Sequence, residues 1–389
     1  MVTKVAGPLF IFLFAYITLY TAQILADMYL VNGKRHRTYV AAVESVFGRR
    51  GGVAIAWIQY VNLILTAVAY NITGATSIQT IVRNECVHNN TPVDDCWDDY
   101  WKFAAMFAGA QLFFSQLPNL DSAWWASAIG AIMSFGYSFI ALGLSIAQGN
   151  HHGTIGGQTA SAADKAFGMF NALGAIVFAF SFAFLLLEIE DTIQDRPGMP
   201  APKAMKRAVN VSLMVVTSFF LAVGIAGYMA FGNSISSNII TNFTSPLWLI
   251  QLANAMVLVH MFPAYQVFSQ PVFMAAERWI EEGPWARDTR TFFITTRLTV
   301  RSLYVFVVGV VALCIPFFGD FVGLIGALGF WPATIFFPVE MYIRTYEVSR
   351  KEKVLLQSIS VFSLIVTILA IIGSIQQIIV DASTYSFFS

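Results

Sequence analysis

Residues 354–380 read VLLQSISVFSLIVTILAIIGSIQQIIV, a stretch of 27 residues without a charged side chain. A helix can cross the hydrocarbon core of a bilayer when about 20 consecutive residues are mainly apolar. Lipid solvates apolar side chains on every face of such a helix, whereas water does not. The stretch therefore predicts a transmembrane helix.

The same apolar character recurs along the chain, and ten segments are predicted to cross the membrane. They are residues 8–31, 53–82, 102–117, 122–147, 167–192, 209–231, 246–274, 299–317, 321–343 and 354–380. The third segment is short and ends at Pro118. Of all residues 57% are hydrophobic and 11% are charged, against roughly 25% charged in an average soluble domain. We predict an all-α, multi-pass membrane protein without a large soluble domain.

Basic residues are distributed unevenly between the two sides of these segments. Of the 22 Lys and Arg residues, 18 lie on the side that holds the connections after the first, fifth, seventh and ninth segments. Positive residues mark the cytoplasmic side of a membrane protein. The pattern therefore predicts that these four connections face the cytoplasm.

Cys86 and Cys96 lie in one connection on the opposite side. That side is predicted to be extracellular or lumenal, where disulfides persist. The two residues form either a disulfide or two unpaired thiols in a polar loop. The same loop contains Asn89-Asn90-Thr91, an acceptor sequence for N-glycosylation.

Several classes of function have no support in the sequence. It contains no Ser/His/Asp set and no phosphate-binding loop. No catalytic residues are therefore identified, and an enzyme is not predicted. The three Cys fit no zinc pattern, and we predict neither a metal nor a cofactor. Net charge is zero and so says nothing about partners, but no basic block or nucleic-acid module is present, and no nucleic-acid partner is predicted.

The charge pattern also has a consequence for the N-terminus. If the connection after residue 31 is cytoplasmic, residues 1–7 lie outside, although they contain no cleavable signal. An even number of spans with both ends outside is unusual. We therefore expect that one upstream helix is missing from this chain.

Five short motifs resemble those of the plant amino acid permeases, within the amino acid/auxin permease family. They are IQYVNL (58–63), SQLPNLD (115–121), EIEDT (188–192), GYMAFG (227–232) and FWPATIFFPVEMYI (330–343). The motifs occur in the family's order, and the likeness runs over about residues 6–380.

The resemblance implies a proton-coupled amino acid symporter with eleven helices and a LeuT-type fold of two inverted five-helix repeats. Residues 1–389 would form one transporter domain, beginning at the second helix. Residues 8–147 would be the remainder of repeat one, residues 167–343 repeat two, and residues 354–380 an extra helix. The expected location is the plasma membrane, in contact with lipid; the sequence does not choose between proton and sodium coupling or indicate an oligomeric state.

In a LeuT-type fold the sixth helix is broken at mid-membrane, and its freed backbone groups bind the substrate. The resemblance places this break within residues 174–182, GAIVFAFSF, flanked by Gly174 and Ser181. Alternatively, this is an ordinary packed helix with a small residue at a close contact. The predicted substrate-binding residues here are Gly174, Phe178, Ala179, Phe180 and Ser181. Many plant members carry Asp where Ala175 stands and Tyr where Phe180 stands, so a more apolar pocket is expected.

Polar residues on two other segments are further candidates. Tyr70 matches a family Tyr that faces the substrate pocket, and Asn254 is a second candidate for substrate binding. Asn62 and Asn71 are interpreted instead as groups that make hydrogen bonds between helices.

Two ionisable residues are candidates for proton coupling. His260 lies in the middle of segment 246–274, where a histidine serves either as a proton relay or as a structural group bonded to backbone freed by Pro263. Glu188 either carries protons or belongs to an ion network at the cytoplasmic ends of the helices. That network would comprise Asp27, Glu188, Glu190, Asp191 and Glu340.

Three other readings of the whole chain stay open. One is an amino acid sensor that binds without transport, and the second is an inactive, truncated permease. The third, carriage of an auxin-like substrate, is an alternative within the same family.

Overall fold

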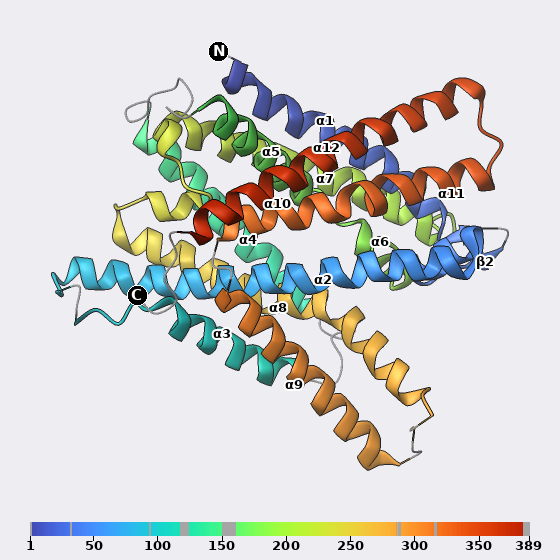
Figure 1. The fold of residues 1–389 in the computed structure, drawn as a ribbon, viewed down its shortest axis with the longest axis horizontal. Coiled ribbons are helices and arrows are strands. Elements are labelled where there is room, and N and C mark those ends of the chain that lie inside the picture. Colours follow the sequence, from blue (N-terminus) through green and yellow to red (C-terminus); the bar gives the residue numbers. More distant parts are fainter. Residues whose placement is uncertain are drawn as a thin grey trace. The chain divides into compact units, whose positions relative to one another are not determined.

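A computed structural model describes residues 2–31, 33–92, 95–116, 124–149, 161–284, 286, 289–314 and 317–383. Nearly all of these residues are helical, as predicted (Figure 1). Residues 117–121 of the SQLPNLD motif lie outside the described part of the chain.

The elements follow one another along the chain in a nearly all-helical order. They are α1 (Val2–Asp27), β1 (Leu30–Val31), β2 (Lys34–Arg35), α2 (Tyr39–His88), α3 (Tyr100–Ser115), α4 (Trp124–Gln148), α5 (Ala162–Ala179), α6 (Ala183–Asp191), α7 (Ala201–Phe231), η2 (Gly232–Ser234), η3 (Ile239–Asn242), α8 (Leu247–Glu281), α9 (Arg290–Cys314), α10 (Phe318–Gly329), η4 (Phe330–Phe336), α11 (Phe337–Thr345) and α12 (Arg350–Ala382).

Within the described residues, nine helical stretches are long and apolar enough to cross a membrane. Of the ten predicted segments, the third is not among these nine, because α3 has 16 residues among those described. At a rise of 1.5 Å per residue it is about 24 Å long, which is less than a hydrocarbon core of about 30 Å. The multi-pass class is confirmed, with one helix too short to span by itself.

Two features near the N-terminus differ from the prediction. The first segment ends at Asp27, because residues Leu30–Val31 and Lys34–Arg35 pair as a small antiparallel hairpin. The second begins at Tyr39, well before residue 53, and bends at Gly48, whose φ of 71° suits glycine.

The chain divides into two compact units, and each is described by itself. The first comprises Met1–Asn62, Thr154–Ile225 and Gly319–Asp381. It therefore takes segments from both halves of the chain. The division into two sequential repeats stays a prediction.

Glycines bring the helices of the first unit into close contact. A Cβ added at Gly326 would lie 2.3 Å from the Gly174 carbonyl oxygen, and one at Gly373 would lie 2.6 Å from the Asn171 amide nitrogen. Helix α5 thus packs backbone to backbone against α10 and α12. The Asn171 amide also donates to Asp320 at 2.6 Å and accepts from the Ser374 hydroxyl at 2.8 Å.

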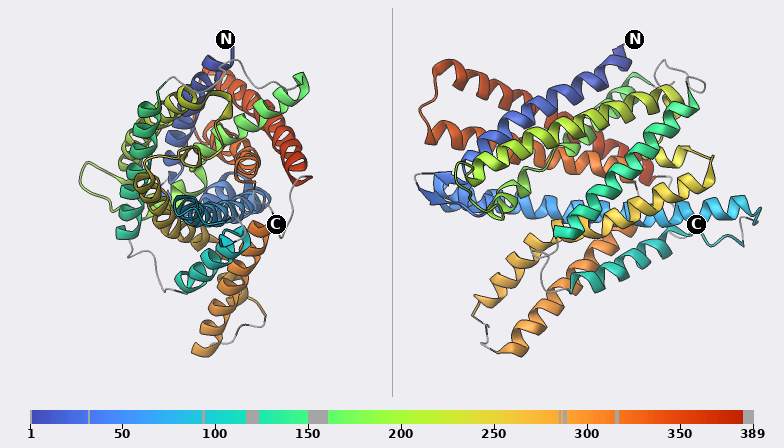
Figure 2. Two further views of the ribbon diagram at one scale, coloured as in Figure 1. Left: turned by 90° about the vertical axis from the view of Figure 1, so that its left-hand side faces the viewer. Right: turned by 180° about the vertical axis from the view of Figure 1, so that it is seen from behind.

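The FWPATIFFPVEMYI motif starts as a π-helix, η4 (Phe330–Phe336), and continues as α11. Pro332 lacks an amide hydrogen, which accounts for a departure from regular α-helical bonding here. Trp331 donates its indole N–H to Ser360 of α12 at 3.1 Å. Both ribbon views show α11 and α12 running side by side from their connecting loop (Figures 1 and 2).

The second unit comprises Leu63–Gly153, Ala226–Phe318 and Ala382–Ser389. Here Phe107 of α3 fills the space beside Gly74 of α2, and Met256 of α8 fills the space beside Gly136 of α4. A disulfide joins Cys86 to Cys96, the pair that the sequence indicated.

A buried arginine holds the C-terminal end of α3 in the second unit. Arg301 of α9 is 4% exposed, donates to the Ser115 carbonyl at 2.8 Å and pairs with Glu277 of α8 at 2.7 Å. The positive guanidinium suits the carbonyl end of a helix. Gln266 of α8 completes the contact by donating to Gln111 at 2.7 Å.

Candidate functional site

The break that the resemblance predicts within residues 174–182 is present. Helix α5 ends at Ala179 and α6 begins at Ala183, so residues 180–182 separate them. The amides of Phe180 and Ser181 donate three residues back, at 3.2 and 2.9 Å, instead of four as in an α-helix. Such a break leaves carbonyls of one half and amides of the other without partners in their own helix. Within the break, the Val177, Phe178 and Phe180 carbonyls accept from the backbone amides of Phe180, Ser181 and Phe182.

Side chains around the break divide into buried and accessible ones. Phe180 is buried and meets Phe220 of α7 edge to face, with ring centroids 5.7 Å apart. Ser181 is half-buried and donates to the Val177 carbonyl at 2.8 Å. Phe178 is half-buried and Ala179 is exposed. These four predicted residues lie within or directly before the break.

Gly174 has a different position relative to the break from the one predicted. It stands inside regular helix α5, so it does not border the break. A Cβ there would lie 2.3 Å from the Gly323 carbonyl oxygen and 3.0 Å from its Cα. Gly174 therefore permits the contact between α5 and α10, which was the alternative interpretation of this glycine.

Two polar residues of α2 hold the helices on either side of this region. Gln59 donates to the Phe184 carbonyl of α6 at 2.6 Å, and Asn62 donates to the Ile325 carbonyl of α10 at 2.9 Å. Both side chains are buried. Asn62 thus makes a hydrogen bond between helices. The role of Gln59 was missed in the sequence, since a lone Gln gives no signal of its partner.

Glu188 lies one turn beyond the start of α6 and is bound through one oxygen. Oε1 accepts from the Gln59 amide at 2.9 Å and from the Tyr39 backbone N–H at 3.3 Å. Oε2 is buried and has no hydrogen-bond partner among the described residues. Glu188 therefore belongs to a hydrogen-bond network and makes no ion pair within the described part of the chain.

The predicted ion network at the helix ends forms in part. Asp27 pairs with Lys206 at 2.6 Å, Asp191 with Arg37 at 3.9 Å, and Glu340 with Arg344 at 3.8 Å, while Arg35 pairs with Asp195. Glu190 takes no part in it: its side chain is 0% exposed and has no hydrogen-bond partner among the residues described.

His260 of α8 faces α4 within the second unit. Its Nδ1 lies 2.8 Å from the Gly130 carbonyl oxygen and 3.2 Å from the Ser134 hydroxyl, and Tyr137 approaches the ring edge-on at 6.0 Å between centroids. Because a carbonyl only accepts, Nδ1 carries the hydrogen, and Nε2, which lies 3.5 Å from the Ser134 hydroxyl, is the nitrogen with the lone pair. The backbone partner belongs to α4, not to the turn of α8 before Pro263, so that part of the structural interpretation is wrong.

The other predicted polar residues also lie in the second unit. Tyr70 meets Phe268 edge to face at 5.3 Å. Asn254 donates to the Ile250 carbonyl at 2.9 Å, and its oxygen is buried without a described partner. Asn71 is fully buried, and the structure gives neither amide atom a partner among the described residues. Within the residues that the structure describes, the predicted bond between helices is therefore not formed by Asn71.

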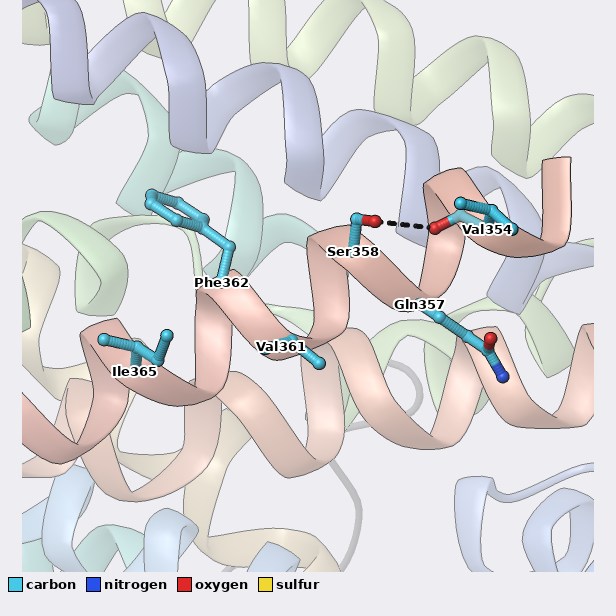
Figure 3. Close-up of a pocket in the computed structure, with 6 residues that line it drawn as sticks. All are labelled: Val354, Gln357, Ser358, Val361, Phe362 and Ile365. Carbon is cyan, nitrogen blue, oxygen red and sulfur yellow. Dashed lines mark hydrogen bonds between the residues drawn. The ribbon is translucent and has the colours of Figure 1, made fainter. Parts of the chain in front are cut away.

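A surface hollow of about 470 Å³ lies along α12 (Figure 3). Its lining residues all come from that helix and are Val354, Gln357, Ser358, Val361, Phe362 and Ile365. Ser358 uses its hydroxyl on the Val354 carbonyl at 2.8 Å. Since a hollow formed by one exposed helix does not enclose a solute, we do not assign substrate to it.

Nine apolar helical stretches of membrane length among the described residues define a multi-pass membrane protein, and one of these stretches is broken at residues 180–182. Residues 4–380 match the family described as "Transmembrane amino acid transporter protein". The chain belongs to this family, and the resemblance noted in the sequence is confirmed.

Similar proteins occur in Arabidopsis thaliana. "Amino acid permease 2" is 37% identical, over 99% of this chain and 83% of its own length. "Amino acid permease 6" is 38% identical, over 96% of this chain and 84% of its own length. "Lysine histidine transporter-like 1" is 31% identical, over 96% of this chain and 81% of its own length.

Proposed function

We propose that this protein is a proton-coupled amino acid symporter of the plasma membrane. The observation that carries the proposal is the break at residues 180–182, in a chain 37% identical to an amino acid permease. An amino acid presents a carboxylate and an ammonium group. Freed backbone amides suit the first and freed carbonyls the second.

The side chains at the break favour substrates with apolar or small neutral side chains. Ala175 is uncharged, and Phe180 lies with its ring against Phe220 and offers no hydroxyl. A charged side chain would lose hydration there without a compensating partner. We therefore expect acidic and basic amino acids to be poor substrates.

The geometry of His260 supports a role in proton coupling. The Gly130 carbonyl fixes the hydrogen on Nδ1, so that Nε2 is the atom that takes up and releases a proton. Glu188, with one oxygen free of described partners, is the second candidate proton carrier. Tyr70 and Asn254 remain candidates for substrate contacts through the family resemblance.

Uptake of radiolabelled amino acids into a yeast strain that lacks its own permeases tests the proposal. Wild-type protein should take up neutral amino acids faster at acidic than at neutral external pH. His260→Gln should lose most of that pH dependence, while the control His88→Gln, on an exposed histidine, should keep it. Uptake that is absent at every pH, despite protein at the cell surface, would refute transport and favour a sensor.

A further inference from the structure

Glu190 is a buried carboxyl group without a hydrogen-bond partner in the described part of the chain. It lies near the end of α6 with a side chain that is 0% exposed, and neither carboxyl oxygen has a hydrogen-bond partner among the described residues. Its neighbours differ. Asp191 accepts from the Tyr29 hydroxyl at 2.9 Å, and Glu188 accepts from the Gln59 amide at 2.9 Å. The unpartnered state is thus particular to Glu190.

Charged and titratable groups from three segments of the chain interact electrostatically with Glu190. Asp27 ends α1, Tyr29 precedes the β-hairpin, and Lys206 lies in the first turns of α7. Lys206 is occupied, because its Nζ lies 2.6 Å from the Asp27 carboxylate. The charge of Asp27 also acts on two tyrosines at the end of α11, Tyr342 and Tyr346.

This arrangement cannot stabilise the ionised forms of both Asp27 and Glu190. A carboxylate buried without a partner loses its hydration and gains nothing in return. A single ammonium group neutralises Asp27 or Glu190, and in this structure it is bound to Asp27. Glu190 is then accommodated as a neutral acid, which needs no counter-charge.

We propose that Glu190 is a proton-binding site of the transporter, and that release of its proton transfers Lys206 from Asp27 to Glu190. The O–H bond of the Glu190 carboxylic acid breaks, and the proton passes to water. The Lys206 ammonium leaves the Asp27 carboxylate and pairs with the new carboxylate. Asp27 has a side chain that is 35% exposed, so water replaces the lost ammonium.

The exchange links protonation to the contact between α1 and α7. The Asp27–Lys206 ion pair joins these two helices, as does the bond from Gln23 to Asn210 at 2.6 Å. The Gln23 bond carries no ionisable group, so the ion pair is the proton-sensitive part of the contact. As a step in proton coupling, the inference rests on the proposed function. The proton would leave on the side of the membrane that holds most of the basic residues.

Infrared difference spectroscopy of the purified full chain tests the proton site without any transport assay. At neutral pH the wild-type spectrum should contain the carbonyl stretch of a protonated carboxyl that Glu190→Gln lacks. The control Glu340→Gln removes an ion-paired carboxylate from α11 and should leave that band unchanged. If the wild-type and Glu190→Gln spectra do not differ in this band, the proposal is wrong.

Two further variants test the exchange of Lys206 in opposite directions. Asp27→Asn frees the ammonium for Glu190, so the band should disappear at neutral pH. Lys206→Met removes the ammonium, so the band should persist to more alkaline pH than in wild type. A band that is unaffected in both variants would refute the exchange.

Transport assays then test this inference separately from the proposed function. Glu190→Gln should still exchange labelled for unlabelled amino acid across the membrane but lose accumulation driven by a pH gradient. If the wild-type chain transports nothing while the infrared band behaves as expected, the proton site stands and the proposed function fails. Normal accumulation by Glu190→Gln would overturn the coupling role.

Discussion

Gly174→Ala is expected to destabilise the contact between α5 and α10. The added methyl would lie 2.3 Å from the Gly323 carbonyl oxygen, whereas carbon contacts are favourable at about 3.5–4.0 Å. The two helices must therefore separate by about 1 Å. Overpacking of this kind costs about 1–3 kcal/mol, and we expect the upper end because the obstacle is backbone.

A matched control lies on the same helix. Gly168 has nothing within 4 Å of an added Cβ, so Gly168→Ala should gain the helix preference of alanine, about 1 kcal/mol. The same gain offsets part of the cost at Gly174. Gly174→Ala should thus lose about 2 kcal/mol net, and the two variants should differ by about 3 kcal/mol.

Thermal denaturation in one detergent measures this difference. The fraction of protein that remains folded after heating is the height of the monodisperse peak in size-exclusion chromatography. Unfolding of such a protein is generally irreversible, so midpoints are compared at equal heating times. Gly174→Ala should melt several degrees below wild type, and Gly168→Ala at or above it. A Gly174→Ala protein that melts with wild type would refute the close approach of α5 and α10.

Three further predictions concern stability. Burial, and secondly the charge of Lys34, lower the pKa of His36. Stability should therefore fall as pH drops through the ordinary histidine range near 6.5, and the melting temperature of His36→Gln should depend less on pH than that of wild type. Asn62→Ala leaves a buried Ile325 carbonyl without that donor and should cost about 1–2 kcal/mol in a denaturation midpoint; no change would show that the bond is absent. Cys86→Ser should melt at a lower temperature than wild type, and reductant should lower the melting temperature of wild type but not of this variant. A wild-type melting temperature that reductant does not change would contradict a stabilising disulfide.

Most of the membrane helices could be predicted because lipid favours uniformly apolar segments, which composition alone reveals. The ends of the helices could not. Residues 39–52 include Glu44, Arg49 and Arg50, so their hydropathy hides a segment whose backbone is helical up to and beyond Gly48. The β-hairpin before it has two residues in each strand, too few to produce an alternating pattern.

The break in the sixth helix was predictable from the family resemblance but not from its residues. Phe180, Ser181 and Phe182 are compatible with a helix, and the neighbouring Gly174 suggested a break nearer to itself. Its actual role depends on Gly323, far along the chain, which a single sequence does not pair with it. Burial of Glu190 in the EIEDT motif likewise depends on tertiary packing, which the motif itself does not reveal.

Accumulation of an amino acid by the purified protein in liposomes tests the proposed transport most directly. With sodium absent and an acidic exterior, we expect a neutral amino acid to accumulate inside above its external concentration. A protonophore should abolish the accumulation, and Glu190→Gln should lack it. Liposomes that contain the folded protein and yet take up no more amino acid than protein-free liposomes, under any imposed gradient, would contradict the assignment as an amino acid symporter.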